Sequence, residues 1–294
     1  MDFGLTLPNY RAGSSREGLE AAIDAAERLG FSIVWTTDHV LVEEASRVEY
    51  GRIFDAILTL AYLAARSSTV KLGTSVVVVP QRAAVVVAKQ LATLDVLSQG
   101  RLIAGVGIGW NRIEFENLGM GDRFRVRGAY LDEAIDLWRH LWSGSSEPFE
   151  GRFHHLTDFV FEPLPAQAGG PPIVVGGRSE HALRRAGRKG DGYHFSSGAP
   201  SGVLGRLPAV RAAAEEAGRP MPWVSGRVRT VLGPKPSDGY AVAGTPDEMA
   251  TDIRAFAAAG VEHLALALDE RDPDHYVAAL ERFVAEVKPL VANT

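Results

Sequence analysis

Short runs of apolar and β-branched residues alternate with segments of helical hydrophobic period along almost the whole chain. The run at 70–79 is nearly continuous in apolar residues, which is typical of a strand buried on both faces of a parallel sheet. Such alternation predicts parallel strands joined by crossover helices. The eight runs interpreted as strands are 3–7, 33–36, 70–79, 102–106, 173–175, 192–196, 224–232 and 263–268.

The intervening segments place apolar side chains three and four positions apart, as one face of a helix requires. The clearest start lies at Thr245, which can cap a helix, with Pro246 at its first position and Glu248 completing a capping box. Gly260 is expected to end that helix. Eight strand and helix units in one chain predict an α/β fold, a TIM (β/α)8 barrel, as a single domain over residues 1–294.

Two regions are longer than a minimal barrel needs, one after the second strand and one after the fourth. The first is 40–52; the second comprises 110–128 and, further along, 149–165. Gly151, with phenylalanines around it, predicts a hairpin within 149–165. Insertions of this kind often shape a pocket, so we expect them to contribute to the substrate wall.

Composition excludes several classes of protein. The net charge of -5 and the lack of a long basic block argue against nucleic-acid binding. No cysteine is present, which excludes disulfides and thiolate sites and suits a reducing compartment. No leader or long uninterrupted apolar run is found, so we expect a cytoplasmic protein without membrane attachment. The histidines show no metal-binding spacing, so no metal site is predicted.

In a TIM barrel the active site lies at the carboxyl ends of the strands, so polar residues there are the candidates. Asp38 and His39 directly follow the strand at 33–36, and a neighbouring carboxylate can hold a histidine in one tautomer for proton transfer. The alternative is that Asp38 caps the next segment and His39 is an ordinary loop residue.

Two further strand ends carry small residues suited to a flat ligand. Thr74, Ser75 and Val76 lie inside the most apolar run, where unpaired hydroxyls would be costly, although they could simply bond nearby carbonyls. The segment 105–110 reads GVGIGW; with Trp110 in place of a third spaced glycine, it fails the dinucleotide-binding fingerprint. Its glycines still permit close approach of a ligand, with tight-turn packing as the alternative.

A phosphate site is predicted late in the barrel. Gly176 and Gly177 follow an apolar strand and precede a helix, so their N–H groups and the positive charge of Arg178 suit a phosphate. Ser196 and Ser197, at the end of the next strand, could add hydroxyl donors. A glycine-rich turn without a ligand is the alternative.

Taken in order, these segments resemble the luciferase-like monooxygenase superfamily, particularly its F420-dependent oxidoreductases. The similar stretches are 30–35 with Asp38 and His39, 71–76 with Pro80, 88–90, 92–95, 100–101, 105–110 with Glu114 and Phe115, 172–177, 185–186, 191–192 and 244–246. The resemblance implies hydride transfer between coenzyme F420 and a small organic substrate, a cis Ser75–Val76 peptide behind the ring, and a homodimer. Trp110 stands where sugar-phosphate dehydrogenases of the family carry a glutamate, which argues against a sugar phosphate.

The expected catalytic residues are therefore His39, assisted by Asp38, and Trp110 as part of an apolar wall. The alternatives are an FMN-dependent monooxygenase that uses O2, a flavin-binding homologue without activity, and a metal-dependent hydrolase. The last would need several histidines and carboxylates at strand ends, where only Asp38 and His39 stand out. The residues expected to bind the cofactor are Asp38, Thr74, Ser75, Val76, Gly105, Gly107, Val175, Gly176, Gly177, Arg178 and Ser196.

Overall fold

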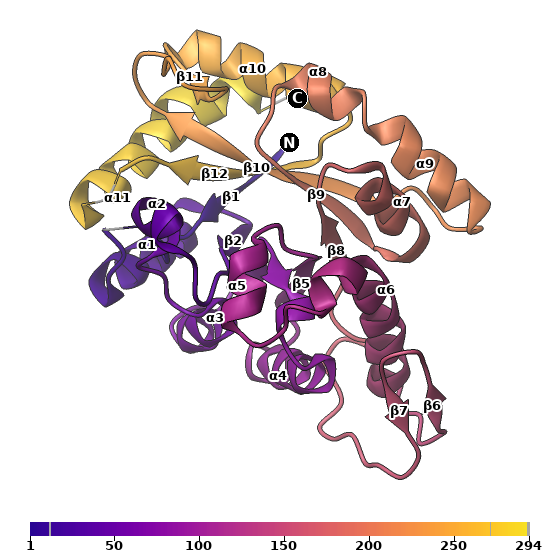
Figure 1. Ribbon diagram of the computed structural model, residues 1–294. Helices are drawn as coiled ribbons and strands as arrows, with labels where there is room; N and C mark the ends of the chain where they lie inside the picture. Colours follow the sequence, from indigo (N-terminus) through magenta and orange to yellow (C-terminus); the bar gives the residue numbers. More distant parts are fainter. Residues whose placement is uncertain (12, 271, 293–294) are drawn as a thin grey trace.

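The computed structural model describes residues 1–11, 13–270 and 272–292, and it is a closed barrel of parallel strands surrounded by helices (Figure 1). Strand β1 pairs with β2 on one side and with β12 on the other, which closes the barrel and confirms the predicted fold. Seven of the eight staves begin and end within one residue of the predicted runs; β3 ends five residues early. The eight staves are β1 (Asp2–Thr6), β2 (Ile33–Thr36), β3 (Lys71–Thr74), β5 (Leu102–Gly107), β8 (Ile173–Gly176), β9 (Gly192–Ser196), β10 (Trp223–Val231) and β12 (His263–Leu268).

Helices cover the outside of the barrel (Figure 1). The helix at Thr245 begins with the predicted capping box, and Gly260 follows its end with a positive φ of 89°. The longer helices are α1 (Arg16–Leu29), α3 (Ala56–Ala64), α4 (Ala84–Leu97), α6 (Arg123–Trp142), α7 (Glu180–Lys189), α9 (Leu207–Glu216), α10 (Pro246–Ala258) and α11 (Pro273–Arg282). The short helices are α2 (Arg47–Tyr50), α5 (Arg112–Asn117) and α8 (Pro200–Leu204), with single turns or π-helix at Glu44–Ser46, Val79–Gln81, Phe283–Val287 and Lys288–Val291.

The prediction of one continuous strand over 70–79 is wrong. β3 ends at Thr74, a cis peptide joins Ser75 to Val76, and β4 (Val77–Val78) then pairs with β5. The apolar pattern did not reveal the break because it reports burial, and these residues are buried on both sides of it. The cis peptide that the family resemblance implied is present at this bulge.

The two inserted regions have different positions relative to the strand ends. The segment after β2 forms α2 beside the carboxyl ends of the strands, and the segment after β5 forms α5 and the start of α6. The predicted hairpin is confirmed as β6 (Phe149–Glu150) paired with β7 (His155–Leu156). It packs on α6, where the Glu133 carboxylate accepts hydrogen bonds from three successive backbone N–H groups at 152–154. The hairpin therefore packs against the side of α6, and none of its residues lines the cavity at the strand ends. The expectation that it shapes the substrate pocket is wrong.

The barrel interior holds two buried histidines beside an apolar cluster that contains Trp35. Trp35 stacks on His194, with ring centroids 4.5 Å apart, while its Nε1 donates to His263 Nε2 over 3.1 Å. Burial lowers the pKa of His194 and of His263 to about 3, so both rings are neutral near pH 7.

A small extra strand, β11 (Val242–Ala243), extends the sheet beside β10.

Candidate active site

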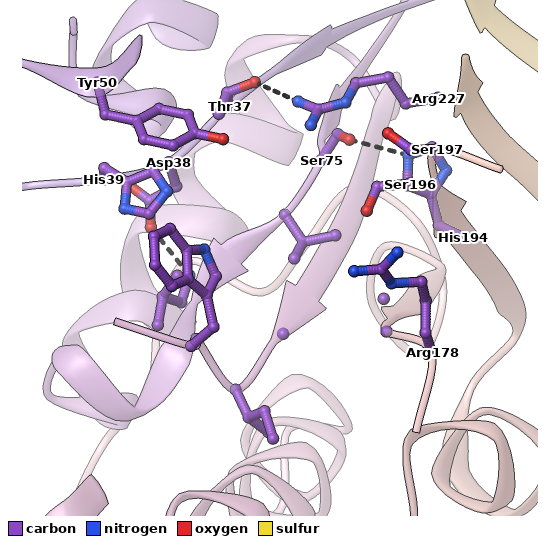
Figure 2. Close-up of a pocket in the computed structure, with 18 residues that line it drawn as sticks. Thr37, Asp38, His39, Tyr50, Ser75, Arg178, His194, Ser196, Ser197 and Arg227 are labelled. Carbon is purple, nitrogen blue, oxygen red and sulfur yellow. Dashed lines mark hydrogen bonds between the residues drawn. The ribbon is translucent and has the colours of Figure 1, made fainter. Parts of the chain in front are cut away.

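A cavity of about 470 Å³ opens at the carboxyl ends of the strands. Figure 2 shows its polar side chains converging from separate strand ends. The predicted site residues that line the cavity are Asp38, His39, Ser75, Val76, Gly107, Trp110, Gly176, Gly177, Arg178 and Ser196. The structure therefore brings most of the predicted site to one place.

Three predicted cofactor-binding residues do not line this cavity. Thr74 is fully buried and its hydroxyl donates to the Gly105 carbonyl over 2.6 Å, which is the local hydrogen bond that the sequence left as the alternative. A Cβ on Gly105 would lie 1.6 Å from the Thr74 carbonyl oxygen, so Gly105 serves strand packing. Val175 is fully buried. The structure therefore does not place these three residues at the cavity, because side chains alternate between the two faces of each strand.

The floor of the cavity is the Ser75–Val76 bulge. The Val76 side chain lies between two glycines: a Cβ on Gly107 would be 2.5 Å from Val76 Cγ2, and one on Gly176 would be 3.0 Å from Val76 Cγ1. Both glycines line the open cavity, so the wall beside Val76 carries no side chains at these two points. A flat ligand can therefore approach the backbone closely there.

His194 orders the polar part of that floor. Its Nε2 lies 2.9 Å from the Ser75 hydroxyl and its Nδ1 lies 2.8 Å from the Ser225 hydroxyl. Because the ring is neutral, one nitrogen donates and the other accepts, which fixes the direction of the two hydrogen bonds together. No role was predicted for His194; the available signal was a histidine in the middle of an apolar strand.

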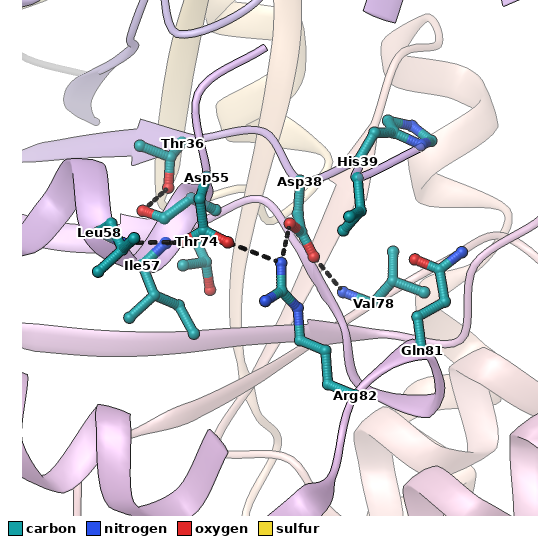
Figure 3. A network of polar contacts seen from close by, with 12 residues as sticks. Thr36, Asp38, His39, Asp55, Ile57, Leu58, Thr74, Val78, Gln81 and Arg82 are labelled. Atoms are coloured by element: carbon teal, nitrogen blue, oxygen red, sulfur yellow. Dashed lines mark hydrogen bonds and ion pairs between the residues drawn. The ribbon is translucent and has the colours of Figure 1, made fainter. Parts of the chain in front are cut away.

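Asp38 lies at the mouth but does not hold His39. Its two carboxylate oxygens accept hydrogen bonds from Arg82 Nη2, at 2.7 Å, and from the Val78 backbone N–H, at 2.9 Å (Figure 3). The same guanidinium also contacts Asp55, the N-cap of α3, at 3.1 Å. Asp38 therefore ties the end of β2 to the turn before α4, and its expected assistance to His39 is corrected.

The carboxylate that contacts His39 is Glu114 on α5. Glu114 Oε2 lies 2.9 Å from His39 Nδ1, and the same carboxylate accepts hydrogen bonds from Val40 N and Gln81 Nε2. Burial would raise the pKa of Glu114, but these donors outweigh it and lower the pKa below its usual value. An ionised Glu114 only accepts, so Nδ1 carries the proton and Nε2 of the neutral ring is an acceptor.

His39 is held in place by aromatic neighbours as well. Its ring lies 4.1 Å from the Tyr50 ring and meets the Trp110 ring edge-on at 5.9 Å. Among the described residues, no group is hydrogen-bonded to His39 Nε2, and His39 lines the cavity. Trp110 is 60% exposed, so it forms part of the rim as predicted for an apolar wall.

The predicted phosphate site has donors from several elements. Gly177 has a φ of 134°, which favours glycine, and its carbonyl accepts a hydrogen bond from the Tyr193 hydroxyl at 3.0 Å. Arg178 and Arg206 both lie close enough to Tyr193 to act on its pKa, which burial nevertheless raises. Arg206 Nη1 is buried without a hydrogen-bond partner among the described residues. This unpaired donor, close to the tyrosine that contacts Gly177, is a group that an anionic ligand would satisfy.

Three other cavity residues were missed by sequence reasoning. Thr37 and Tyr50 come from the segment after β2, and Arg227 comes from β10. Arg227 Nη1 donates to the Thr37 hydroxyl over 3.0 Å. The available signal was an arginine within a strand that otherwise reads as apolar.

Within residues 1–11, 13–270 and 272–292, no cluster of three or more His, Asp or Glu side chains could hold a metal ion. In the same part of the chain, no helix is both long and apolar enough to cross a bilayer.

The fold and the site define an α/β barrel with one polar mouth at the carboxyl ends of its strands. The family model of the luciferase-like monooxygenases matches residues 1–237, so the chain belongs to that family.

Individual relatives and solved structures agree with this membership. The chain is 36% identical over 200 residues to an F420-dependent glucose-6-phosphate dehydrogenase from Kineococcus radiotolerans, a match that covers 66% of this chain and 57% of the relative. A monooxygenase from Streptomyces bottropensis superposes with a TM-score of 0.82 at 24% identity, covering 98% of this chain and 99% of the other. An F420-dependent secondary alcohol dehydrogenase superposes with a TM-score of 0.81 at 22% identity, covering 99% and 98%. At these identities the two structures show the shared fold.

Proposed function

We propose that this protein is an oxidoreductase that transfers a hydride between coenzyme F420 and a small organic substrate. The observation that carries the proposal is the floor of the mouth, where Val76 lies between Gly107 and Gly176 and leaves room for a flat ring. The named activity of the Kineococcus relative supports F420 as the carrier. Membership of the luciferase-like family supports redox chemistry on this barrel.

The residues present fit such a cofactor. Ser75 and Val76 would lie against the ring, and Gly177 and Arg178 would hold its phosphate through N–H groups and a positive charge. Arg206, beside Tyr193, would add a second positive charge outside the cavity lining. When bound, F420 supplies a ring that accepts or donates two electrons as a hydride. The chain's own contribution is orientation, exclusion of water and proton transfer.

His39 is the proposed proton-transfer group, and Glu114 is its positioning residue. The buried Glu114 carboxylate keeps the proton on Nδ1, so Nε2 is available to take a proton from a substrate hydroxyl during oxidation. In the reverse direction the protonated ring returns that proton, while Glu114 stabilises its charge. Trp110 and Ile108 supply apolar contacts beside this point.

Binding of F420 and FMN to the purified protein tests the cofactor assignment. Each carrier is titrated in its oxidised and reduced forms, and quenching of its fluorescence gives the Kd. We expect F420 to bind at least tenfold more tightly than FMN. Tighter binding of FMN would reject F420, and binding of neither would reject the proposed function.

An FMN-dependent monooxygenase is the second candidate, favoured by the family to which the chain belongs. The glycine-lined floor would accept a flavin as well, because the two rings share one outline. Consumption of O2 with reduced FMN and turnover of substrate would favour this candidate. A flavin-binding homologue without activity is less consistent with a buried Glu114–His39 pair aimed at the cavity.

The relative's substrate does not transfer readily to this chain. Trp110 follows the glycine run where the resemblance implies that sugar-phosphate dehydrogenases carry an acid. We therefore expect glucose 6-phosphate not to be oxidised. Assay of the F420-loaded protein with glucose 6-phosphate and with simple secondary alcohols tests this expectation.

We also propose a homodimer in the cytoplasm. Two neighbouring helices expose large apolar side chains, Leu58 and Tyr62 on α3 and Val86 and Leu97 on α4. Exposed apolar side chains on adjacent helices favour association with a second copy. A hydride carrier must be recycled by other enzymes, which supports a cytoplasmic location. Light scattering during gel filtration would give the molar mass, and Leu58→Glu should yield a monomer.

A further inference from the structure

One side of the mouth carries two side chains, Tyr50 and Arg227, that have hydrogen-bond donors without partners among the described residues. Figure 2 shows Tyr50 and Arg227 reaching toward each other beside Thr37, from the segment after β2 and from β10. Among the described residues, Arg227 makes one side-chain hydrogen bond, to the Thr37 hydroxyl, and no ion pair. The Tyr50 hydroxyl is hydrogen-bonded to no described residue, although its ring is packed against His39.

No described carboxylate is paired with Arg227. Asp38 lines the same cavity, but it is held by Arg82, whose Nη2 lies 2.7 Å from Asp38 Oδ1. Glu49 is held by Arg11, whose Nε lies 2.7 Å from Glu49 Oε2. The positive charge of Arg227 is therefore directed into the cavity without a carboxylate to balance it, in a site where water screening is reduced.

Arg227 and the predicted phosphate site occupy different parts of the same wall of the mouth. Arg227 pairs with Ser196 across β10 and β9, and Figure 2 shows Ser196 and Ser197 between Arg227 and Arg178, which follows the end of β8. Arg227 instead lies by Thr37 and Tyr50, next to His39. The two arginines thus suit two different anionic groups, one of them adjacent to the proposed proton-transfer residue.

We propose that Arg227 and Tyr50 form a substrate subsite for an anionic group, a carboxylate or a phosphate, so that the substrate is an organic acid. The inference rests on the proposed function, because it places the reacting carbon of that acid between His39 and the cofactor ring. The guanidinium supplies a charge-assisted hydrogen bond and the phenol a second, neutral one. The acid group is therefore expected to anchor the substrate while His39 acts on the neighbouring hydroxyl.

Anion titration of the F420-loaded protein tests the subsite. Acetate and inorganic phosphate are the probes, acetamide is the neutral control, and isothermal calorimetry at constant ionic strength gives each Kd. We expect saturable binding of at least one anion, no binding of acetamide, a loss of about tenfold or more in Arg227→Gln and a smaller loss in Tyr50→Phe. Arg227→Lys, which keeps the charge, should retain part of the affinity.

A matched control separates local from global charge effects. Arg211→Gln removes one positive charge from an exposed position on α9 that does not line the cavity, and it should leave the anion Kd unchanged. Thermal unfolding of each variant verifies the fold. Equal anion binding by wild type and Arg227→Gln, or none by wild type, would overturn the proposal.

The two possible sources of the anionic group are also distinguished. If Arg227→Gln weakens F420 itself by tenfold, Arg227 binds the cofactor's own acidic groups, and the substrate subsite is rejected while the proposed function stands. If wild type binds neither F420 nor FMN, the proposed function fails. The comparison of wild type with Arg227→Gln on the unloaded protein then still decides whether the anion site exists.

Discussion

His39 Nδ1 and Glu114 Oε2 lie 2.9 Å apart at the mouth of the barrel, and both side chains are more than nine-tenths buried. Glu114 also accepts a hydrogen bond from the Val40 backbone N–H, so the carboxylate holds both the His39 ring and the backbone of the next residue. A buried carboxylate surrounded by donors is an orienting group for the histidine, as in other acid–base sites where a third group positions the base.

Replacing Glu114 by Gln should lower kcat by roughly tenfold to a hundredfold, because the Nδ1 proton loses its charged acceptor. The Kd for F420 should change by less than about twofold. Steady-state kinetics over a range of pH would show an altered pH dependence of kcat, which a purely structural defect would not produce.

A double-mutant cycle checks that Glu114 acts through His39. If it does, His39→Gln combined with Glu114→Gln should be no slower than His39→Gln alone. Additive losses would show that the two residues work independently and would reject the positioning role.

Asp38 should contribute more to stability than to proton transfer. Asp38→Asn leaves Arg82 without its closest carboxylate at a site where the Arg82 side chain is only 17% exposed. Breaking such a buried pair costs on the order of 3 kcal/mol, so the urea midpoint should fall. Single-turnover hydride transfer at saturating F420 should change little. A loss in that rate as large as in His39→Gln would assign Asp38 to the chemistry instead.

The folded protein should lose stability as the pH falls below about 6.5. His194 and His263 have pKa values of about 3 in the folded state because they are buried, whereas unfolded histidines titrate near 6.5. Below that pH the unfolded state binds more protons, so the unfolding free energy decreases, by up to about 1.4 kcal/mol per pH unit for each ring.

Urea unfolding at about pH 7 and pH 5 measures this loss, which should reach a few kcal/mol for the two rings together. In His263→Gln the difference between the two pH values should be about halved. His275, which is exposed, provides the control: His275→Gln should behave like wild type. Equal stability at both pH values would show that the buried rings do not govern the response.

Gly107→Ala should weaken cofactor binding by about tenfold, because the new Cβ would lie 2.5 Å from Val76 Cγ2 and push that side chain toward the ring. Gly205→Ala is the matched control, since its Cβ would have no neighbour closer than 3.6 Å and its φ of -65° suits alanine. Fluorescence titration with F420 compares the two. An unchanged Kd in Gly107→Ala would mean that the ring does not lie against Val76.

The chain's hydrophobic period was enough to predict seven of the eight staves to within one residue, the cap at Thr245 and the hairpin near Gly151. These features depend on the local preferences of residues for caps and turns and on which face of an element is buried, and the spacing of residue types reveals both. The same pattern did not predict the break at Ser75–Val76, because buried residues are apolar whether or not their backbone pairs with a neighbouring strand.

The residue pattern alone was enough to predict the barrel and to place Asp38, His39 and Gly176 at its strand ends. The partners of these residues became known from the three-dimensional fold. Glu114 reaches His39 from 75 positions further along the chain, and Arg227 meets Thr37 across 190. Such pairings depend on the path of each loop in the folded chain and on charge separations of a few ångströms. The local hydrophobic period carries no information about these distances.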